Sequence, residues 1–221
     1  MKQILAFSTM SLFFVLLACE SKECKEIRQN YKFQIPVALS PALDTFHIGD
    51  TIWIQSIIDK MVFDIETGAH YLLEDYQFHP TTSMGKMDQN TTDKDALRFF
   101  NYGLISETDY EYYRYSGGIS TLKGEYAYDG KKYELVYFLV PREKGLFVFF
   151  HSLLFGFRDE HQPFPGKCPK VPADAVTLLN NGSDNNIEFL QHSPDPHYRW
   201  VLEEPEDRFH RGGGYCFYVV E

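Results

Sequence analysis

The residues of this chain that could do chemistry are histidines and carboxylates in the last third of the sequence. Asp159, Glu160 and His161 are adjacent, and His192 and His197 flank a short segment that contains two prolines. A zinc site needs three or four ligands, usually at a recognisable spacing such as His-Glu-x-x-His, and that spacing does not occur here. The sequence therefore predicts no metal site and no cofactor.

Two further reaction types lack their residue patterns. The chain contains no Gly-x-Ser-x-Gly nucleophile elbow. Glu203, Glu204, Glu206 and Asp207 supply carboxylates, but glycoside hydrolysis needs two of them about 5–9 Å apart across a cleft, which adjacency in sequence does not provide. The catalytic residues are therefore unknown, and we interpret the acidic run as a solvated loop. A hydrolase, whose carboxylates and histidines meet only in the folded chain, is the alternative to a binding or structural protein.

The first 19 residues have the pattern of a bacterial export signal. Met1-Lys2-Gln3 is positively charged, and the following 14 residues, Ile4 to Leu17, are largely apolar. As a helix they would span about 21 Å, which is short of the ~30 Å hydrocarbon core, so a signal peptide is favoured over a membrane span. The segment ends in Leu16-Leu17-Ala18-Cys19, which resembles the lipobox of bacterial lipoproteins. The resemblance implies cleavage after residue 18 and lipidation of the Cys19 thiol, whereas an ordinary secretory signal followed by a chance cysteine is the alternative.

Three cysteines follow the lipobox, and an exported protein can form disulfides between them. Cys168 lies in a Pro-rich segment and Cys216 in a strand-like run, so a bond between them would close 48 residues and contribute roughly 4 kcal/mol. Cys24 with Cys168 is the competing pair, which would fasten the N-terminal tether to the body. Three free thiols are the remaining alternative.

Hydrophobic alternation predicts an all-β fold. Residues 31–39 alternate with period two, and Pro36 suggests an edge strand. Asp129-Gly130 predicts a type I′ hairpin turn into residues 131–140, which are apolar on both faces and therefore predict a central strand covered on both sides. Long amphipathic helices are missing. We expect a signal peptide (1–18), a lipid-anchored tether (19–30) and a single antiparallel β-sandwich-like domain (31–221), with one or two short helices and a Pro-rich loop region near the C-terminus.

Charge and aromatic content bear on the partners. With 31 acidic and 21 basic side chains the net charge is −10, which argues against a nucleic-acid surface. Eight of the 15 tyrosines lie between residues 110 and 137. Tyrosine combines an apolar ring with a polar tip, so Tyr113, Tyr115, Tyr126 and Tyr128 are a candidate binding face for a glycan or an envelope protein. The alternative is structural, because tyrosine also has high β propensity and packs across strands.

The lipobox, the segment from Phe46 to Ile54 and the closing Gly213-Gly214-Tyr215-Cys216-Phe217 together resemble a group of uncharacterised cell-envelope lipoproteins of Bacteroidota. The resemblance implies a lipid-anchored protein of the envelope, at the outer membrane, without deciding the leaflet. It carries over no functional residues. We therefore expect an envelope protein that is held at the membrane through Cys19 and acts by binding or by structure rather than catalysis.

Overall fold

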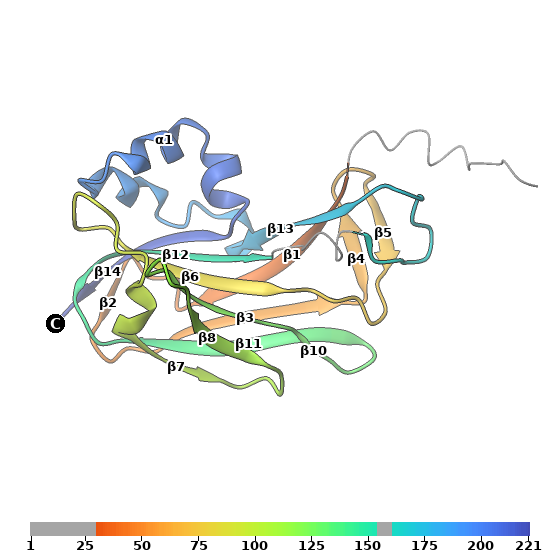
Figure 1. Ribbon diagram of the computed structural model, residues 1–221, viewed down its shortest axis with the longest axis horizontal. Helices are drawn as coiled ribbons and strands as arrows, with labels where there is room; N and C mark the ends of the chain where they lie inside the picture. Colours follow the sequence, from red (N-terminus) through yellow and green to blue (C-terminus); the bar gives the residue numbers. More distant parts are fainter. Residues whose placement is uncertain (1–29, 154–160) are drawn as a thin grey trace, which may run out of the picture.

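Two β-sheets packed face to face form the body of the computed structural model, which describes residues 30–153 and 161–221 (Figure 1). The larger, eight-stranded sheet has the order β10-β11-β3-β1-β4-β5, with β13 paired to β1 and β7 paired to β11. Its strands are β1 (Tyr31–Ser40), β3 (Ile52–Asp59), β4 (Met61–Asp64), β5 (Ala69–Leu72), β7 (Phe100–Leu104), β10 (Ala127–Tyr128), β11 (Lys132–Pro141) and β13 (Ala173–Leu179). The predicted all-β sandwich-like fold is confirmed. The edge position that Pro36 suggested is wrong, because β1 lies inside its sheet and pairs with β3, β4 and β13.

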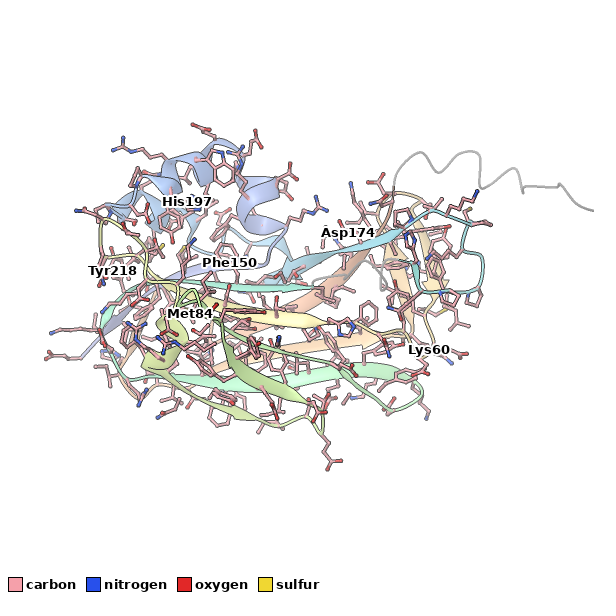
Figure 2. The ribbon with its side chains drawn as sticks, in the orientation of Figure 1. Lys60, Met84, Phe150, Asp174, His197 and Tyr218 are labelled. Atoms are coloured by element: carbon pink, nitrogen blue, oxygen red, sulfur yellow. The ribbon has the colours of Figure 1, made fainter. Side chains whose placement is uncertain are left out.

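The second sheet has six strands in the order β2-β14-β12-β6-β9-β8. Its strands are β2 (Thr45–His47), β6 (Pro80–Lys86), β8 (Tyr110–Arg114), β9 (Ser120–Gly124), β12 (Gly145–Leu153) and β14 (Gly214–Val220). Side chains from both sheets fill the space between them, with Met84 of β6 among them (Figure 2). Alternation explains the packing, since every second residue of β3 is buried, from Ile52 to Ile58.

Short helices cover the outer face of the six-stranded sheet (Figure 1). They are the 3-10 turn η5 (Ile187–His192), the α-helix α1 (His197–Glu203) and the π-helical turn η6 (Glu206–His210). Another 3-10 turn, η4 (Asn180–Gly182), follows β13 and contacts β1 of the larger sheet. The helical layer and the sheet beneath it form a second, smaller core. Its members are Leu190, Tyr198, Val201 and Phe209 of the layer, with Leu146 and Val148 of β12 and Cys216 of β14. One further 3-10 turn, η2 (Ala96–Phe99), follows Asp95 and leads directly into β7.

Two predictions about β11 need correction. The hairpin at Asp129-Gly130 forms, but only Gly130 has a positive φ (86°), so the turn is not type I′, which needs two such residues. Strand β11 lies inside its sheet, yet only one of its faces is fully buried: its residues alternate between half-buried and buried along its length. Val136, Phe138 and Val140 therefore contribute to an outer face that no element covers completely.

The predicted disulfide between Cys168 and Cys216 is wrong. Cys216 has a free, fully buried thiol beneath the helical layer. Cys168 is disulfide-bonded, and its backbone N–H donates to the Tyr31 hydroxyl at 2.9 Å, near the start of β1. In Figure 1 the loop before β13, which holds Cys168, lies at the end of the molecule opposite the C-terminus. Because Cys216 is free and no other cysteine lies among the described residues, the partner of Cys168 lies outside them, as do Cys19 and Cys24.

Candidate functional site

Of the exposed tyrosines, Tyr112 and Tyr113 lie on β8 and Tyr115 directly follows it; β8 is an edge strand of the six-stranded sheet. Alternation along β8 sends Tyr110 into the core, where its hydroxyl donates to Thr82 at 2.8 Å, and places Glu111 and Tyr113 on the opposite face. The neighbouring strand β9 presents Lys123 directly across from Glu111. One face of this strand pair therefore combines aromatic rings with charges of both signs.

Tyr113, Tyr115 and Lys123 form what we call the tyrosine surface. Tyr113 and Tyr115 are 46% and 45% exposed, and their ring centroids lie 4.7 Å apart in an edge-to-face arrangement. The Lys123 ammonium lies 3.7 Å from the Tyr113 ring centroid and 5.4 Å from that of Tyr115. A cation over a tyrosine ring is attracted by the ring quadrupole, so the lysine holds the rings in place while both remain accessible.

A shallow hollow of about 250 Å³ adjoins the tyrosine surface. It is lined by Asp109, Glu111, Tyr112, Tyr113, Lys123 and Gly124. Its volume is below the ~300–1,000 Å³ usual for an enclosed small-molecule site, so it suits one end of a surface-bound ligand. A β-carbon on Gly124 would lie 1.7 Å from the Asp109 carbonyl oxygen, so glycine is required for the close approach of the two chains beside the hollow.

The four-tyrosine binding face predicted from the sequence is divided by the fold. Tyr126 is buried and donates to the Ser56 hydroxyl at 3.0 Å, and its burial raises its pKa above the ordinary value. Tyr128 is half-buried and stacks on Tyr133 with ring centroids 4.4 Å apart. Tyr113 and Tyr115 therefore remain as the accessible part, and sequence reasoning missed Lys123 and the hollow beside them.

A second aromatic surface, which the sequence did not indicate, lies on the outer face of the eight-stranded sheet. Trp53 of β3, Phe138 of β11 and Gly103 of β7 are direct neighbours across three strands. The Trp53 and Phe138 rings lie 5.2 Å apart, and the Phe138 ring covers Gly103, where a β-carbon would approach within 2.3 Å. Trp53 is 40% exposed and nearby Ile105 is 56% exposed. The only available signal was Trp53 at an outward position of an alternating strand.

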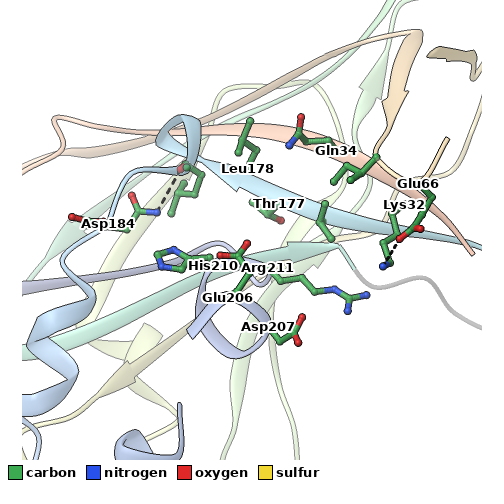
Figure 3. A pocket seen from close by; sticks show the side chains of 15 residues that line it. Lys32, Gln34, Glu66, Thr177, Leu178, Asp184, Glu206, Asp207, His210 and Arg211 are labelled. Atoms are coloured by element: carbon green, nitrogen blue, oxygen red, sulfur yellow. Dashed lines mark hydrogen bonds and ion pairs between the residues drawn. The ribbon is translucent and has the colours of Figure 1, made fainter. Parts of the chain in front are cut away.

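Ionisable side chains gather in a groove of about 480 Å³ between β1, β13 and η6 (Figure 3). Four carboxylates line it, together with Lys32, His210 and Arg211; the carboxylates are Glu66, Asp184, Glu206 and Asp207. Lys32 forms a 2.5 Å ion pair with Glu66, and Arg211 pairs with Asp174, so neighbouring carboxylates neutralise both cations. The groove does include Glu206 and Asp207 of the acidic run, whereas Glu203 and Glu204 pair with Arg208 on another side.

The residues proposed for a hydrolase do not assemble into a site within the described part of the chain. His161 is exposed, and Asp159 and Glu160 lie outside the described residues. The His192 ring contacts the Tyr218 hydroxyl at 3.0 Å, and His197 packs against Trp200. Within residues 30–153 and 161–221, no group of three His, Cys, Asp or Glu side chains could hold a metal ion.

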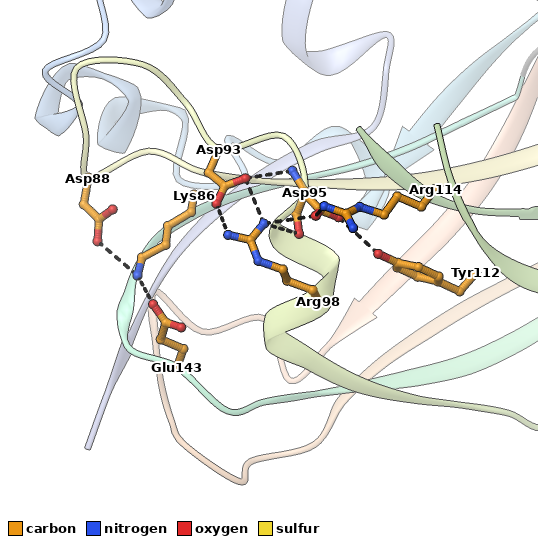
Figure 4. A network of polar contacts seen from close by, with 8 residues as sticks. All are labelled: Lys86, Asp88, Asp93, Asp95, Arg98, Tyr112, Arg114 and Glu143. Atoms are coloured by element: carbon orange, nitrogen blue, oxygen red, sulfur yellow. Dashed lines mark hydrogen bonds and ion pairs between the residues drawn. The ribbon is translucent and has the colours of Figure 1, made fainter. Parts of the chain in front are cut away.

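A charged network stabilises the turn beside β8 (Figure 4). The Asp95 carboxylate is almost fully buried and accepts from the Tyr112 hydroxyl at 3.1 Å, with Arg114 at 2.7 Å and Arg98 at 3.3 Å. Asp93 pairs with Arg98, which holds the pKa of the Asp93 carboxyl below its ordinary value. These contacts bind η2 to β8 and so support the strand that carries Tyr113 and leads into Tyr115.

A polar cluster lies in the core between the sheets, out of reach of any ligand. Thr82, Tyr110, Tyr137 and His151 are all buried. The Thr82 hydroxyl contacts those of Tyr110 and Tyr137 and lies 2.9 Å from Nδ1 of His151, whereas Nε2 of His151 has no hydrogen-bond partner among the described residues. Burial lowers the His151 pKa to about 3 and raises those of Tyr110 and Tyr137, so all three side chains stay neutral at ordinary pH.

Comparison with known proteins leaves the family open. No family model and no curated protein matches the chain. Two crystal structures of the human F-spondin reeler domain resemble it with TM-scores of 0.32 and 0.31 and sequence identities of 12% and 10%. The matches cover 59% and 58% of this chain and 84% and 79% of those chains. A structure of the Reelin-N domain of F-spondin gives a TM-score of 0.29 at 11% identity, and likeness of this size carries no functional argument.

No helix in residues 30–153 or 161–221 is long and apolar enough to cross a membrane.

Proposed function

We propose that this protein is a lipid-anchored component of the bacterial envelope that binds a glycan, without catalysis, through the tyrosine surface. The observation that carries the proposal is the pair of exposed rings of Tyr113 and Tyr115, held beside Lys123 at the edge of the hollow. Exposed aromatic rings on a rigid strand are ready to bind because little side-chain freedom is lost on contact.

The chemistry of the surface favours a glycan over other ligands. The rings offer apolar faces to the C–H face of a sugar, and the hydroxyl, ammonium and carboxylate groups around them can bond to sugar hydroxyls. Asp109 and Glu111 stand beside the single cation Lys123, so the local charge does not select an anionic ligand. A neutral, hydroxyl-rich chain laid across β8 and β9 satisfies both kinds of group.

Affinity electrophoresis of the domain in gels that contain soluble polysaccharides tests this function. We would use xyloglucan, mixed-linkage β-glucan, galactomannan, dextran and peptidoglycan fragments as probes. At least one should retard the wild-type domain, and Tyr113→Ala/Tyr115→Ala should abolish the retardation. Trp200→Ala is the matched control, because Trp200 is an exposed aromatic of α1 outside the tyrosine surface. If no probe retards the protein, or the double variant binds as well as the wild type, glycan binding at this surface is refuted.

The proposed anchor is the lipid on Cys19, as the resemblance of Leu16-Leu17-Ala18-Cys19 to a lipobox implies. Several acyl chains on one residue anchor a protein stably, at about 0.8 kcal/mol for each buried methylene. Metabolic labelling with an alkynyl fatty acid should mark the wild-type protein in the membrane fraction, and Cys19→Ala should remove the label. Recovery of an unlabelled protein that retains residues 1–18 would contradict the proposal.

A further inference from the structure

The tether enters the body beside Cys168. The backbone N–H of Tyr31 donates to the Pro172 carbonyl at 3.0 Å, and the Tyr31 hydroxyl accepts from the Cys168 N–H at 2.9 Å. The Tyr31 ring also packs against Phe164, with centroids 5.0 Å apart. The start of β1 and the loop of residues 161–172 are therefore joined by contacts at one end of the molecule.

The state of the cysteines restricts the partner of Cys168. Cys168 is disulfide-bonded and Cys216 is free. The chain contains four cysteines, so Cys19 and Cys24 are the remaining candidates. A Cys19 thiol that carries lipid has no sulfur available for a disulfide, which leaves Cys24.

We propose that Cys24 bonds to Cys168, and that this bond turns the loop of residues 161–172 toward the lipid surface. As the S–S bond forms, the two thiols lose two protons and two electrons, which a disulfide-bearing oxidase of the envelope accepts by thiol–disulfide exchange. The inference rests on the proposed function for the lipid on Cys19. Cys24 is only five residues after the lipidated Cys19, so a disulfide from Cys24 to the body holds the anchor at this end of the sandwich. The C-terminal end, with β2 and β14, then points away from the membrane (Figure 1).

Chain geometry gives the size of the effect. Twelve residues separate Cys19 from Tyr31, so an unfastened tether could place the body about 40 Å from the anchored residue at 3.3–3.6 Å per residue. Cys24 is five residues from Cys19, which limits their separation to roughly 18 Å, and a disulfide adds about 6 Å between Cα atoms. The bond therefore shortens the reach of the tether by about 40% and makes one orientation of the body dominant.

The composition of the loop suits a membrane-facing position. Residues 161–172 include Lys167 and Lys170 and no acidic residue, in a chain whose net charge is −10. Lys170 is exposed, and Lys167 lies over the Phe164 ring, 5.5 Å from its centroid. Lysines near an anionic lipid surface are attracted to it, so the loop favours phospholipid headgroups where the acidic remainder of the body does not.

Peptide mapping without reduction tests the bond. The full-length protein is expressed with its own signal, extracted in detergent, alkylated under denaturing conditions and digested for mass spectrometry. We expect a linked pair of peptides containing Cys24 and Cys168, an alkylated Cys216 and an acylated Cys19. An acylated Cys19 with an alkylated Cys24 would overturn this inference and leave the proposed anchor intact, whereas an unacylated Cys19 would overturn the anchor itself.

Lysine acetylation on vesicles tests the orientation. The purified lipoprotein is inserted into vesicles of phosphatidylethanolamine and phosphatidylglycerol and compared with the same protein in detergent. Acetylation of Lys170 should slow severalfold on vesicles. Lys144 is exposed and lies in space beside the C-terminal residue Glu221, with which it forms an ion pair, so it should react at an unchanged rate.

The paired variant Cys24→Ser/Cys168→Ser serves as the control for the bond. It should stay on the vesicles, because it keeps its lipid, and the acetylation rate of Lys170 should recover toward that in detergent. Slowing at Lys144 but not at Lys170 would show that the opposite end faces the membrane. Protection of Lys170 that persists in the paired variant would assign the orientation to the loop rather than to the disulfide, and would also overturn the proposal.

Discussion

Lowering the pH should destabilise the fold through His151. The imidazole lies between the two sheets, with Nδ1 2.9 Å from the Thr82 hydroxyl and 3.1 Å from that of Tyr137. Because a buried imidazolium would lose its hydration, the folded protein keeps the ring neutral and its pKa falls from 6.5 to about 3. The unfolded chain binds a proton to this histidine below about pH 6.5, and the folded chain does not.

The size of the effect follows from the two pKa values. The stability that comes from the neutral ring is complete above pH 6.5 and is lost as the pH falls toward 3, which amounts to roughly 5 kcal/mol over the whole range. At pH 5 the loss is already about 2 kcal/mol, because the unfolded histidine is mostly protonated there and the folded one is not.

Urea unfolding of wild type and His151→Gln, followed by circular dichroism at pH 7, 6 and 5, measures this loss. Glutamine keeps hydrogen-bonding groups near Thr82 and Tyr137 but does not titrate. Every other titrating group is common to the two proteins, so the wild type should lose about 2 kcal/mol more than the variant between pH 7 and pH 5. Parallel loss in both proteins would refute the reasoning. Should the variant not fold, an NMR titration of the His151 ring in the wild type gives the folded-state pKa directly.

Three further substitutions probe the core and the support of the tyrosine surface. Tyr137→Phe removes one hydroxyl from the buried polar cluster and should cost about 1–3 kcal/mol in urea unfolding, since its neighbours lose a partner. Gly124→Ala places a β-carbon 1.7 Å from the Asp109 carbonyl oxygen, so it should lower the free energy of unfolding by about 1–3 kcal/mol. It should also weaken retardation by polysaccharide, as Tyr113→Ala/Tyr115→Ala does. Asp95→Asn removes a buried carboxylate that Arg114 contacts at 2.7 Å and should lower the free energy of unfolding by about 2 kcal/mol. This value is below that for a fully buried ion pair, because solvent screens the exposed arginine. An unchanged unfolding midpoint in any one of these variants would contradict the role given to that residue.

The sandwich could be predicted because its strands carry the period-two signal of one buried face. Residues 31–39 alternate in the sequence and alternate in burial along β1. Strand β6 (Pro80–Lys86) gave no such signal, because residues 80–95 are polar. The polar side chain of Thr82 is nonetheless fully buried, since it hydrogen-bonds to hydroxyls from β8 and β11 and to an imidazole from β12. Partners so distant in sequence cannot be assigned from composition.

The candidate site could be predicted in part for a related reason. Tyrosine content located the region, but it could not separate Tyr113, which is exposed, from Tyr126, which is buried. Their positions depend on the pairing of β8 with β9 and on the contact of Tyr126 with Ser56, 70 residues away. The pairing of the cysteines could not be predicted for the same reason, because the sequence does not reveal that Cys216 lies beneath α1 and η5.

The buried thiol of Cys216 can report local opening of the helical layer. Its sulfur lies between β14 and the helical layer, and burial raises its pKa, so a thiol reagent can reach a reactive thiolate only after that layer lifts. The rate of modification in native buffer then measures how often α1 and η5 detach while the sandwich stays closed. Because Cys216 is native, opening of the helical layer can be timed separately from global unfolding without an engineered cysteine.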